Sequence, residues 1–353
     1  MQRVYYVNEQ NGNELNALTK ARQDVRYILD EIGWNEKLIH RKIESQNKII
    51  HYFRMGFWTV WDWIHLLNNL EEHAILLIQF PMINSLIFNE IAAKLISKEK
   101  EKKYLKVILL IHDIDSIRFP DQEMKQKKHE LAFWNIADVF IAHNTEMKKY
   151  LQDLGIEKPI IELGIFDYIV GKQREKNKEF PLDQIVIAGN LDSNKARYLL
   201  NLKDIRGIQF NLYGPCFTEE SNGINIKYKG VYSPDVLPEK IEGSWGLVWD
   251  GDSIFSCEGG YGNYLRYNDP HKLSFYMAIG MPVIIWEDAA AAKFVQNMRV
   301  GITVKNLKEV PDKIAEISSS EYKNIQDNVE KISYKVRNGI FLKQAIKKCL
   351  HLL

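Results

Sequence analysis

Residues 268–272, NDPHK, combine side-chain types that could bind a diphosphate. Asn or Asp commonly caps a helix and Pro suits the first helical position, so we predict a helix that begins at Pro270 and carries Lys272 in its first turn. Free backbone amides and the helix dipole would add to the charge of Lys272 and favour an anionic ligand. A well-capped helix with a solvated lysine is the alternative. It explains the cap but not the polar loop upstream, which contains Asp250 and Asp252.

A second polar turn, AGNL, contains Gly189 and Asn190 and follows an apolar run. Glycine lets the backbone approach a ligand because it has no Cβ, and Lys195 could then reach a phosphate. An ordinary turn with a capping asparagine explains the pattern equally well. Tyr213 and Tyr232 could stack on a nucleobase, although packing is the commoner role of each. A diphosphate site beside a nucleobase site indicates the donor half of a nucleotide-sugar enzyme. The predicted donor-side residues are Gly189, Asn190, Lys195, Tyr213, Tyr232, Asp250, Asn268, His271, Lys272 and Ser274.

The segment HDIDSIR, residues 112–118, carries the candidates for a general base. It follows an apolar run, and charged side chains at the carboxyl end of a parallel strand are well placed for catalysis. A carboxylate here could deprotonate an acceptor hydroxyl, and we rank Asp115 first, Asp113 second and His112 third. At least one of the two aspartates could instead cap the next helix or pair with Arg118.

Acceptor-side candidates come from two other places in the chain. Thr19, Lys20 and Asp24 lie where a polar loop runs into a helix, and could present backbone and charge to an acceptor. The start of a surface helix is an equally good interpretation of these three residues. His143 follows another apolar run directly, in the same arrangement as the general-base candidates.

No metal or other cofactor is expected. Asp250 and Asp252 have the spacing of a metal-binding pair, but we interpret them as hydrogen-bonding residues of a ligand loop. The three cysteines, Cys216, Cys257 and Cys349, are odd in number and lack metal-ligand spacing, which favours reduced thiols in a cytoplasm.

The sequence pattern predicts that these residues lie on two series of strands that alternate with helices. Such alternation predicts parallel sheets whose ligands lie at the carboxyl ends of the strands. A charged segment that begins at Gly171 and precedes Pro181 is the best linker candidate. Strand-like runs occur at 4–7, 74–79, 105–111, 139–142, 184–190, 208–213, 245–249 and 283–286. We predict an N-terminal acceptor domain at 1–170, a linker at 171–183, a donor domain at 184–330 and a final helix at 331–353 that packs back toward the first domain.

Composition narrows the class of protein. A chain of 353 residues is long enough for two domains, and 47 Lys and Arg nearly balance 46 Asp and Glu, so charge gives no argument for nucleic-acid binding. No apolar run approaches the roughly 20 residues that span a bilayer, and the N-terminus lacks the apolar core of a signal peptide. A Trp-rich block at 57–63, near Arg41, Lys42, Lys48 and Arg54, suits a membrane interface, although packing is commoner. We expect a cytoplasmic protein. Peripheral contact with the inner membrane face and homo-oligomerisation remain open.

The chain resembles the bacterial β-1,6-galactofuranosyltransferases of O-antigen and polysaccharide clusters. It is also similar to the related glucosyltransferases that extend N-acetylglucosamine on serine-rich adhesins. The resemblance is carried by KARQD (20–24), HDIDSIR, AHNTEMKKYL, IFDYIV, AGNL, GLVWDGDS, NDPHK and PVIIW, in this order. The family tends to carry Gly shortly before its Lys-Ala pair, where this chain has ALT at 17–19.

The resemblance implies a GT-B fold, in which two Rossmann-like domains with parallel sheets face a cleft. It also implies an inverting, metal-independent transfer of a hexose from a UDP-sugar to a lipid-linked or protein-linked glycan. UDP contacts cannot separate the donor sugars; the surroundings of HDID and WDGDS favour galactofuranose. A UDP-glucose-dependent enzyme that extends N-acetylglucosamine on an adhesin, and an inactive sugar-binding paralogue, are the alternatives. A Rossmann-type epimerase or dehydrogenase is disfavoured because no GxGxxG follows the first strand.

Overall fold

The computed structural model describes the chain except for residues 1–2, 11–16, 41–47, 83–85, 172–173 and 175–178. It divides into two compact units, which are considered separately. Unit 1 comprises residues 1–143, 148–163 and 342–353, and unit 2 comprises residues 144–147 and 164–341.

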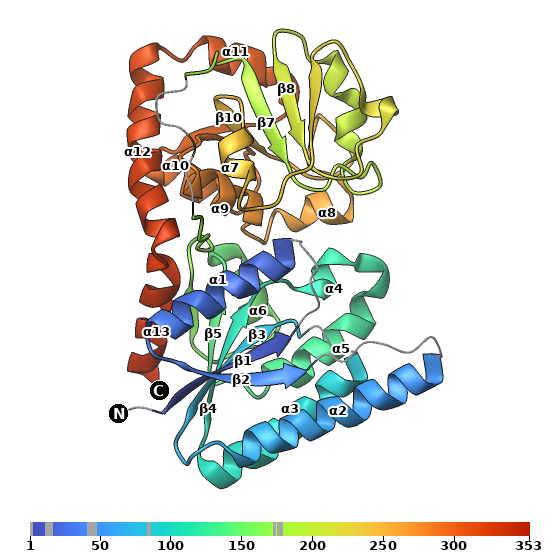
Figure 1. Cartoon of the computed structure of the whole chain (residues 1–353), viewed down its shortest axis with the longest axis vertical. Coiled ribbons are helices and arrows are strands. Elements are labelled where there is room, and N and C mark those ends of the chain that lie inside the picture. The colour runs from blue at the N-terminus through green and yellow to red at the C-terminus, as the bar shows by residue number, and fades with distance from the viewer. Residues whose placement is uncertain (1–2, 11–16, 41–47, 83–85, 172–173, 175–178) are drawn as a thin grey trace. The chain divides into compact units, whose positions relative to one another are not determined.

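Unit 1 is built on a parallel sheet in the order β2-β1-β3-β4-β5-β6. The central strands β3 and β4 are almost entirely buried, which explains their continuous apolar sequences ILLIQF and KVILLI. The strands are β1 (Val4–Gln10), β2 (Asn35–His40), β3 (Ile75–Phe80), β4 (Lys106–Ile111), β5 (Val139–Ala142) and β6 (Ile160–Glu162). The helices are α1 (Ala17–Glu31), α2 (Lys48–Asn68), α3 (Leu86–Lys103), α4 (Asp115–Arg118), α5 (Glu123–Trp134), α6 (Thr145–Asp153) and α13 (Ile340–Leu352) (Figure 1). The first residues of α6 and of α13 belong to unit 2.

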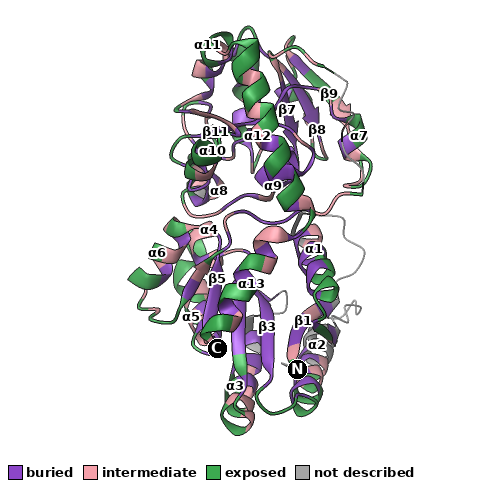
Figure 2. Ribbon diagram, turned by 90° about the vertical axis from the view of Figure 1, so that its left-hand side faces the viewer, coloured by how far each residue is buried: buried purple, intermediate pink, exposed green. Residues whose placement is uncertain are grey.

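Unit 2 holds a second parallel sheet, in the order β12-β11-β10-β7-β8-β9. In both units the inner strands are mostly buried, whereas the helices present exposed stripes (Figure 2). The strands are β7 (Gln184–Ala188), β8 (Gln209–Tyr213), β9 (Ile226–Gly230), β10 (Trp245–Val248), β11 (Val283–Trp286) and β12 (Gly301–Val304). The α-helices are α7 (Leu237–Lys240), α8 (Gly259–Tyr264), α9 (His271–Ala278), α10 (Ala292–Met298), α11 (Val310–Ala315) and α12 (Ser319–Arg337).

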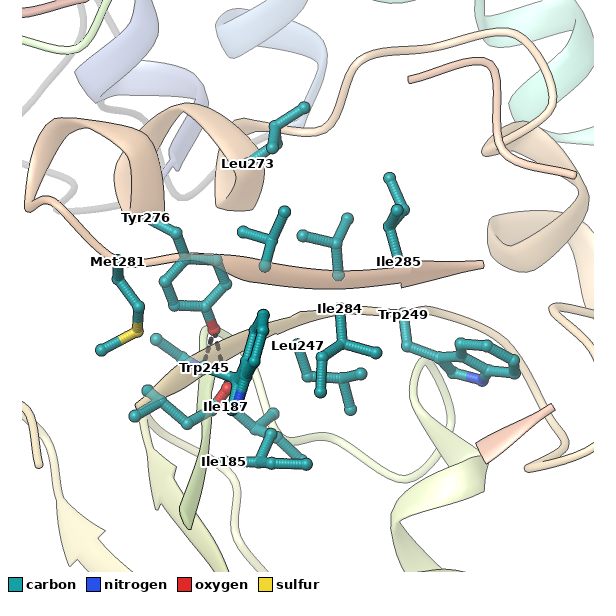
Figure 3. Packing of buried hydrophobic residues seen from close by; sticks show 14 of the residues in the cluster. Ile185, Ile187, Trp245, Leu247, Trp249, Leu273, Tyr276, Met281, Ile284 and Ile285 are labelled. Carbon is teal, nitrogen blue, oxygen red and sulfur yellow. Dashed lines mark hydrogen bonds between the residues drawn. The ribbon is translucent and has the colours of Figure 1, made fainter. Parts of the chain in front are cut away.

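Tyr276 of α9 fixes that helix against the sheet of unit 2. Its ring is buried among apolar side chains, and its hydroxyl accepts a hydrogen bond from Ala188 N at 2.9 Å and donates one to Val186 O at 3.2 Å (Figure 3). A Cβ at Gly246 would lie 2.4 Å from this ring, so β10 needs glycine there. The helix that carries Lys272 is thus held against β7 and β10.

The chain departs from the predicted elements in three places. Strands β2 and β6 were not predicted. The single helix expected at 331–353 is wrong, because α12 ends at Arg337 and α13 begins at Ile340, with Gly339 at a φ of 66° between them. The predicted linker at 171–183 lies partly outside the described residues. Within it, Arg174 donates a hydrogen bond to Gly243 O and lies over the Phe180 ring.

Candidate active site

Two glycines bring the ends of β7 and β8 together in unit 2. Gly189 and Gly214 have φ values of 142° and 143°, and Gly189 N donates to Tyr213 O at 3.0 Å. A Cβ at Gly214 would lie 1.7 Å from Gly189 O, so only glycine permits this approach. A Cβ at Gly189 would lie 3.5 Å from Lys272 Cε. The structure therefore brings together two predicted donor-side residues that are distant in sequence.

Lys272 lies in the first turn of α9, as predicted, and its ammonium group already has partners. Its Nζ atom is 2.7 Å from Asp250 Oδ1 and donates to Trp249 O at 3.0 Å. The predicted cap is wrong in detail. Pro270 is the N-cap residue, with φ −70° and ψ 142°, rather than the first helical residue, and no side chain caps the helix.

The Asp-Gly-Asp sequence forms a tight turn. Asp252 N donates to Glu258 O at 3.2 Å, and a Cβ at Gly251 would lie 2.1 Å from that same carbonyl oxygen. The carboxylate of Asp250 points to Lys272, while Asp252 lies against Gly259. Among the residues that the structure describes, no three His, Cys, Asp or Glu side chains form a group that could hold a metal ion.

The other predicted donor-side residues have varied settings. Lys195 lies 5.3 Å over the Tyr261 ring, and Asn190 accepts a hydrogen bond from Asp192 N at 3.0 Å, as in the turn interpretation. Tyr213 is buried and its hydroxyl donates to Lys240 O at 3.1 Å, so it packs rather than stacking on a base. Tyr232 is 37% exposed.

Three further donor-side residues surround the start of α9. The His271 ring stacks on Phe166 with centroids 5.0 Å apart. Ser274 is buried, and neither its Oγ nor Asn268 Oδ1 has a hydrogen-bond partner among the described residues. These two oxygens are polar groups whose burial is not offset within the described chain, a setting often found where a ligand binds.

Asn144 makes a connection that the sequence analysis missed. Its Oδ1 accepts hydrogen bonds from Glu146 N and Met147 N, each at 3.0 Å, so Asn144 caps α6. Its Nδ2 donates to Asp269 Oδ1 at 2.8 Å and to Tyr267 O at 3.1 Å. Asn144 therefore steadies the loop that leads into α9, and no local sequence pattern signals a contact across 125 positions.

In unit 1, the two aspartates of the HDIDSIR segment both face Arg118. Asp113 Oδ2 is 3.0 Å from Arg118 Nη1, whereas Asp115 Oδ1 is 4.0 Å away. Neither aspartate caps α4, whose N-cap residue is Ile114. Burial, and then the charge of Asp113, raise the pKa of Asp115 to about 6, against the opposing effect of Arg118. Such a pKa suits a general base near neutral pH.

A buried polar cluster lies at the carboxyl ends of β1, β3 and β4. His112 Nε2 is 2.8 Å from Gln79 Oε1, and Arg22 Nη1 donates to Gln79 O at 3.4 Å. Arg22 Nη1 also lies 3.6 Å from Glu9 Oε2. Burial lowers the pKa of Arg22, while Glu9 and Asp113 raise it. Arg22 belongs to the KARQD segment noted in the sequence. Glu9 was not predicted, although a charged residue at the end of β1 was a usable signal.

The acceptor-side candidates are spread over unit 1. Lys20 and Asp24 form an ion pair along α1, and Thr19 is partly exposed on the same helix. His143 is buried at the end of β5, with Nε2 3.1 Å from Ile111 O. The structure therefore sets His143 beside the end of β4, where the general-base segment begins.

Two units, each built on a six-stranded parallel sheet, give the chain the GT-B fold. An α-glucosyltransferase solved with UDP and a DNA containing an HMU base matches with a TM-score of 0.61 at 14% identity, over 99% of this chain and 98% of that one. This likeness concerns the fold.

Two family models cover nearly the whole chain. The glucosyltransferase 3-like N-terminal domain matches residues 4–165, and the glucosyltransferase 3-like C-terminal domain matches residues 185–349. The chain belongs to this family of glycosyltransferases.

Two characterised relatives carry different names. The β-1,6-galactofuranosyltransferase WbbI of Escherichia coli K12 is 29% identical over 98% of each chain. Glucosyltransferase 3 of Streptococcus parasanguinis is 26% identical over 80% of each chain. The family resemblance, the GT-B fold and the enzyme class inferred from the sequence are therefore confirmed. No described helix is long and apolar enough to cross a membrane.

Proposed function

We propose that this glycosyltransferase moves a hexose, with galactofuranose favoured, from a UDP-sugar to a glycan acceptor in the synthesis of a cell-surface polysaccharide, O-antigen or glycoprotein. The observation that carries the donor half is the convergence of Gly189, Asp250 and Lys272 at the carboxyl edge of the unit 2 sheet. Galactofuranose is favoured by the relative WbbI, whose similarity extends over 98% of the chain. UDP is favoured by the solved α-glucosyltransferase complex.

The proposed donor domain spans 184–330 and the acceptor domain 1–170, with 171–183 as linker and 331–353 as a C-terminal extension. Within the donor domain, Lys272 contacts a phosphate while Asp250 and the Trp249 carbonyl hold its ammonium group in place. Lys195 supplies a second positive charge. As the bond between the anomeric carbon and UDP breaks, the negative charge that develops on UDP is stabilised by these lysines.

In the proposed reaction, the acceptor hydroxyl oxygen forms a bond with the anomeric carbon while UDP leaves, with inversion. Asp115 accepts the hydroxyl proton. Asp113 holds Arg118, and His112 lies beside Gln79, so both are better suited to shaping this edge than to taking the proton. Thr19, Lys20, Asp24 and His143 are the proposed acceptor-side residues.

Replacing Lys272 with Ala tests the donor site. A charge-assisted phosphate contact is worth about 1.5–3 kcal/mol, so UDP affinity measured by calorimetry should fall at least about tenfold. Lys323→Ala is the matched control, because Lys323 is an exposed lysine of the same unit whose ammonium group also pairs with an aspartate. Unchanged affinity in Lys272→Ala would remove this residue from the site.

Metal independence is a separate expectation. Since lysines and backbone amides balance the phosphate charge in the proposed site, turnover should persist in EDTA. Loss of turnover in EDTA and its return with Mg²⁺ or Mn²⁺ would instead assign Asp250 and Asp252 as metal ligands.

Two other functions remain in competition. The family models and the streptococcal relative carry the name glucosyltransferase 3, which favours glucose as the transferred sugar. The corresponding alternative is a UDP-glucose-dependent enzyme that extends N-acetylglucosamine on an adhesin. An inactive sugar-binding paralogue would bind UDP without consuming any donor.

We also propose that the protein is cytoplasmic and makes peripheral contact with the membrane, where lipid-linked acceptors reside.

A further inference from the structure

Glu130 is a buried carboxylate of unit 1 that the proposed reaction does not use. It lies on α5 and is 3% exposed. Its Oε1 accepts a hydrogen bond from Ser116 N at 3.0 Å. Its second oxygen, Oε2, is also buried. A carboxylate from one helix therefore holds the backbone of the residue that follows Asp115.

Helix α4, which begins at Asp115, needs such an anchor. It contains four residues, and its N-cap residue, Ile114, makes no side-chain cap. The amides of a first helical turn have no partner within the helix and must find one elsewhere. Glu130 of α5 provides that partner for the amide of Ser116, the residue that follows Asp115. Ile114, the residue that precedes Asp115, has a fully buried side chain. The backbone on each side of Asp115 is thereby fixed.

The Asp115 side chain is the part of this turn that can reach a ligand. Its side chain is 23% exposed, whereas Ser116 and Glu130 are buried. Arg118 lies 4.0 Å from Asp115 and is 1.0 Å closer to Asp113, so it does not fix the Asp115 carboxylate tightly. Orientation of Asp115 then depends mainly on the backbone of the turn.

The charge around Glu130 argues against a role in stability alone. The charge of Asp115 acts on Glu130, and Asp113 and Arg118 in turn act on Asp115. His129, which precedes Glu130 on α5, pairs with Glu90 of α3. Burial raises the pKa of Glu130, hydrogen bonds from Ser116 and from the Asp115 backbone lower it, and the charge of Asp115 raises it. Burying a carboxylate next to other carboxylates is costly, and such arrangements concentrate at functional sites.

We propose that Glu130 is the positioning residue for the general base: by holding the Ser116 amide, it fixes the turn that aims the Asp115 carboxylate at the acceptor hydroxyl. This inference rests on the proposed role of Asp115. Misplacement of a catalytic group by about 1 Å can cost on the order of 100-fold in rate, so an anchor outside the site has a measurable effect.

The test compares Glu130→Ala, which removes the acceptor oxygen, with Glu130→Gln, which keeps an oxygen that can accept the Ser116 hydrogen bond. Glu123→Gln on the exposed start of α5 is the control. We expect kcat to fall about 10- to 100-fold in Glu130→Ala, with UDP affinity within twofold of the parent, and to return to within about threefold in Glu130→Gln. Melting temperatures, and the double variant Asp115→Asn/Glu130→Ala, complete the set. The double variant should turn over no more slowly than Asp115→Asn alone, because a positioning residue has no effect once its base is gone.

The outcomes separate the two proposals. A slow Asp115→Asn together with a Glu130→Ala that keeps the parent rate would overturn the role of Glu130 and leave that of Asp115 intact. A slow Glu130→Gln would also overturn it, because the acceptor oxygen would then not be what matters. An Asp115→Asn that keeps the parent rate would overturn both. If Glu130→Ala fails to fold, the rate of the folded Glu130→Gln variant decides the question.

Discussion

The ammonium group of Lys272 is already balanced by a carboxylate before a ligand binds. Lys272 Nζ lies 2.7 Å from Asp250 Oδ1, and both side chains are largely buried. The pair orients the lysine, because a flexible four-carbon side chain would otherwise lose rotamer freedom on binding. Asp250 is thus better described as a partner of Lys272 than as a direct ligand of the sugar nucleotide.

Asp115 is the residue with the sharpest expected effect on the reaction. Asp115→Asn should lower kcat by roughly 10²–10⁴ while UDP affinity stays unchanged, because only proton transfer is lost.

The raised pKa of Asp115, about 6, predicts that kcat of the parent falls as the pH drops below about 6. Asp113→Asn, measured alongside, should affect mainly the contact with Arg118. If both variants keep the parent rate, the base is not in this turn and His143 becomes the next candidate.

The Asp115→Asn substitution should also stabilise the fold. The folded state binds the Asp115 proton more tightly than the unfolded state, whose carboxyl has the usual pKa of 3.8. Stability therefore falls as the pH rises from about 4 to 6 and the buried group ionises. Asp115→Asn removes this cost and should raise the free energy of unfolding at pH 7 by on the order of 1–3 kcal/mol. Urea unfolding at pH 4 and pH 7 measures it, and a loss of stability at pH 7 would contradict a destabilising charge.

At the scale of elements, α2 exposes an aromatic ridge on unit 1. Phe57, Trp61 and Ile64 are 56%, 55% and 40% exposed and share one helical face, and the rings of Phe57 and Trp61 stack with centroids 6.3 Å apart. Trp63 is buried and Trp58 half-buried, so the packing alternative holds for only part of the block. The side chains of Arg41, Lys42, Lys48 and Arg54 lie outside the described residues.

Membrane contact through α2 is testable by flotation. The parent should float with anionic liposomes, because exposed aromatic side chains insert at the headgroup level. The variant Phe57→Ser/Trp61→Ser should remain in the soluble fraction with an unchanged melting temperature. Tyr334→Ser, an exposed aromatic of α12, is the control. A parent that never floats would contradict this contact.

The position of a strand in its sheet decides whether the sequence predicts it. Strands β3 and β4 are covered on both faces and read as uninterrupted apolar runs. Strand β2, NEKLIH, is an edge strand with exposed polar residues, and β6 has three residues, so neither gives a clear pattern. The end of α12 was missed because one glycine at 339 in a helical pattern is a weak stop signal.

At the scale of the whole molecule, the donor-side residues were easier to predict than their partners. Lys272 and Gly189 stand in local patterns of cap and turn, so the sequence alone singles them out. The contacts of Glu9 with Arg22, Asn144 with Asp269, and Ser116 with Glu130 join different elements. Only the fold brings such pairs together, because their spacing along the chain follows no helical or strand period.

The most direct test of the proposed function is a donor screen with the whole protein. UDP-galactofuranose, UDP-galactopyranose, UDP-glucose and UDP-N-acetylglucosamine are incubated separately, with and without a glycan acceptor, and UDP release and product are measured. The proposal predicts acceptor-dependent consumption of UDP-galactofuranose and formation of a new glycoside. Consumption of UDP-glucose alone would contradict the favoured donor and support the glucosyltransferase alternative. UDP binding with no consumption of any donor would contradict the proposed transferase activity itself.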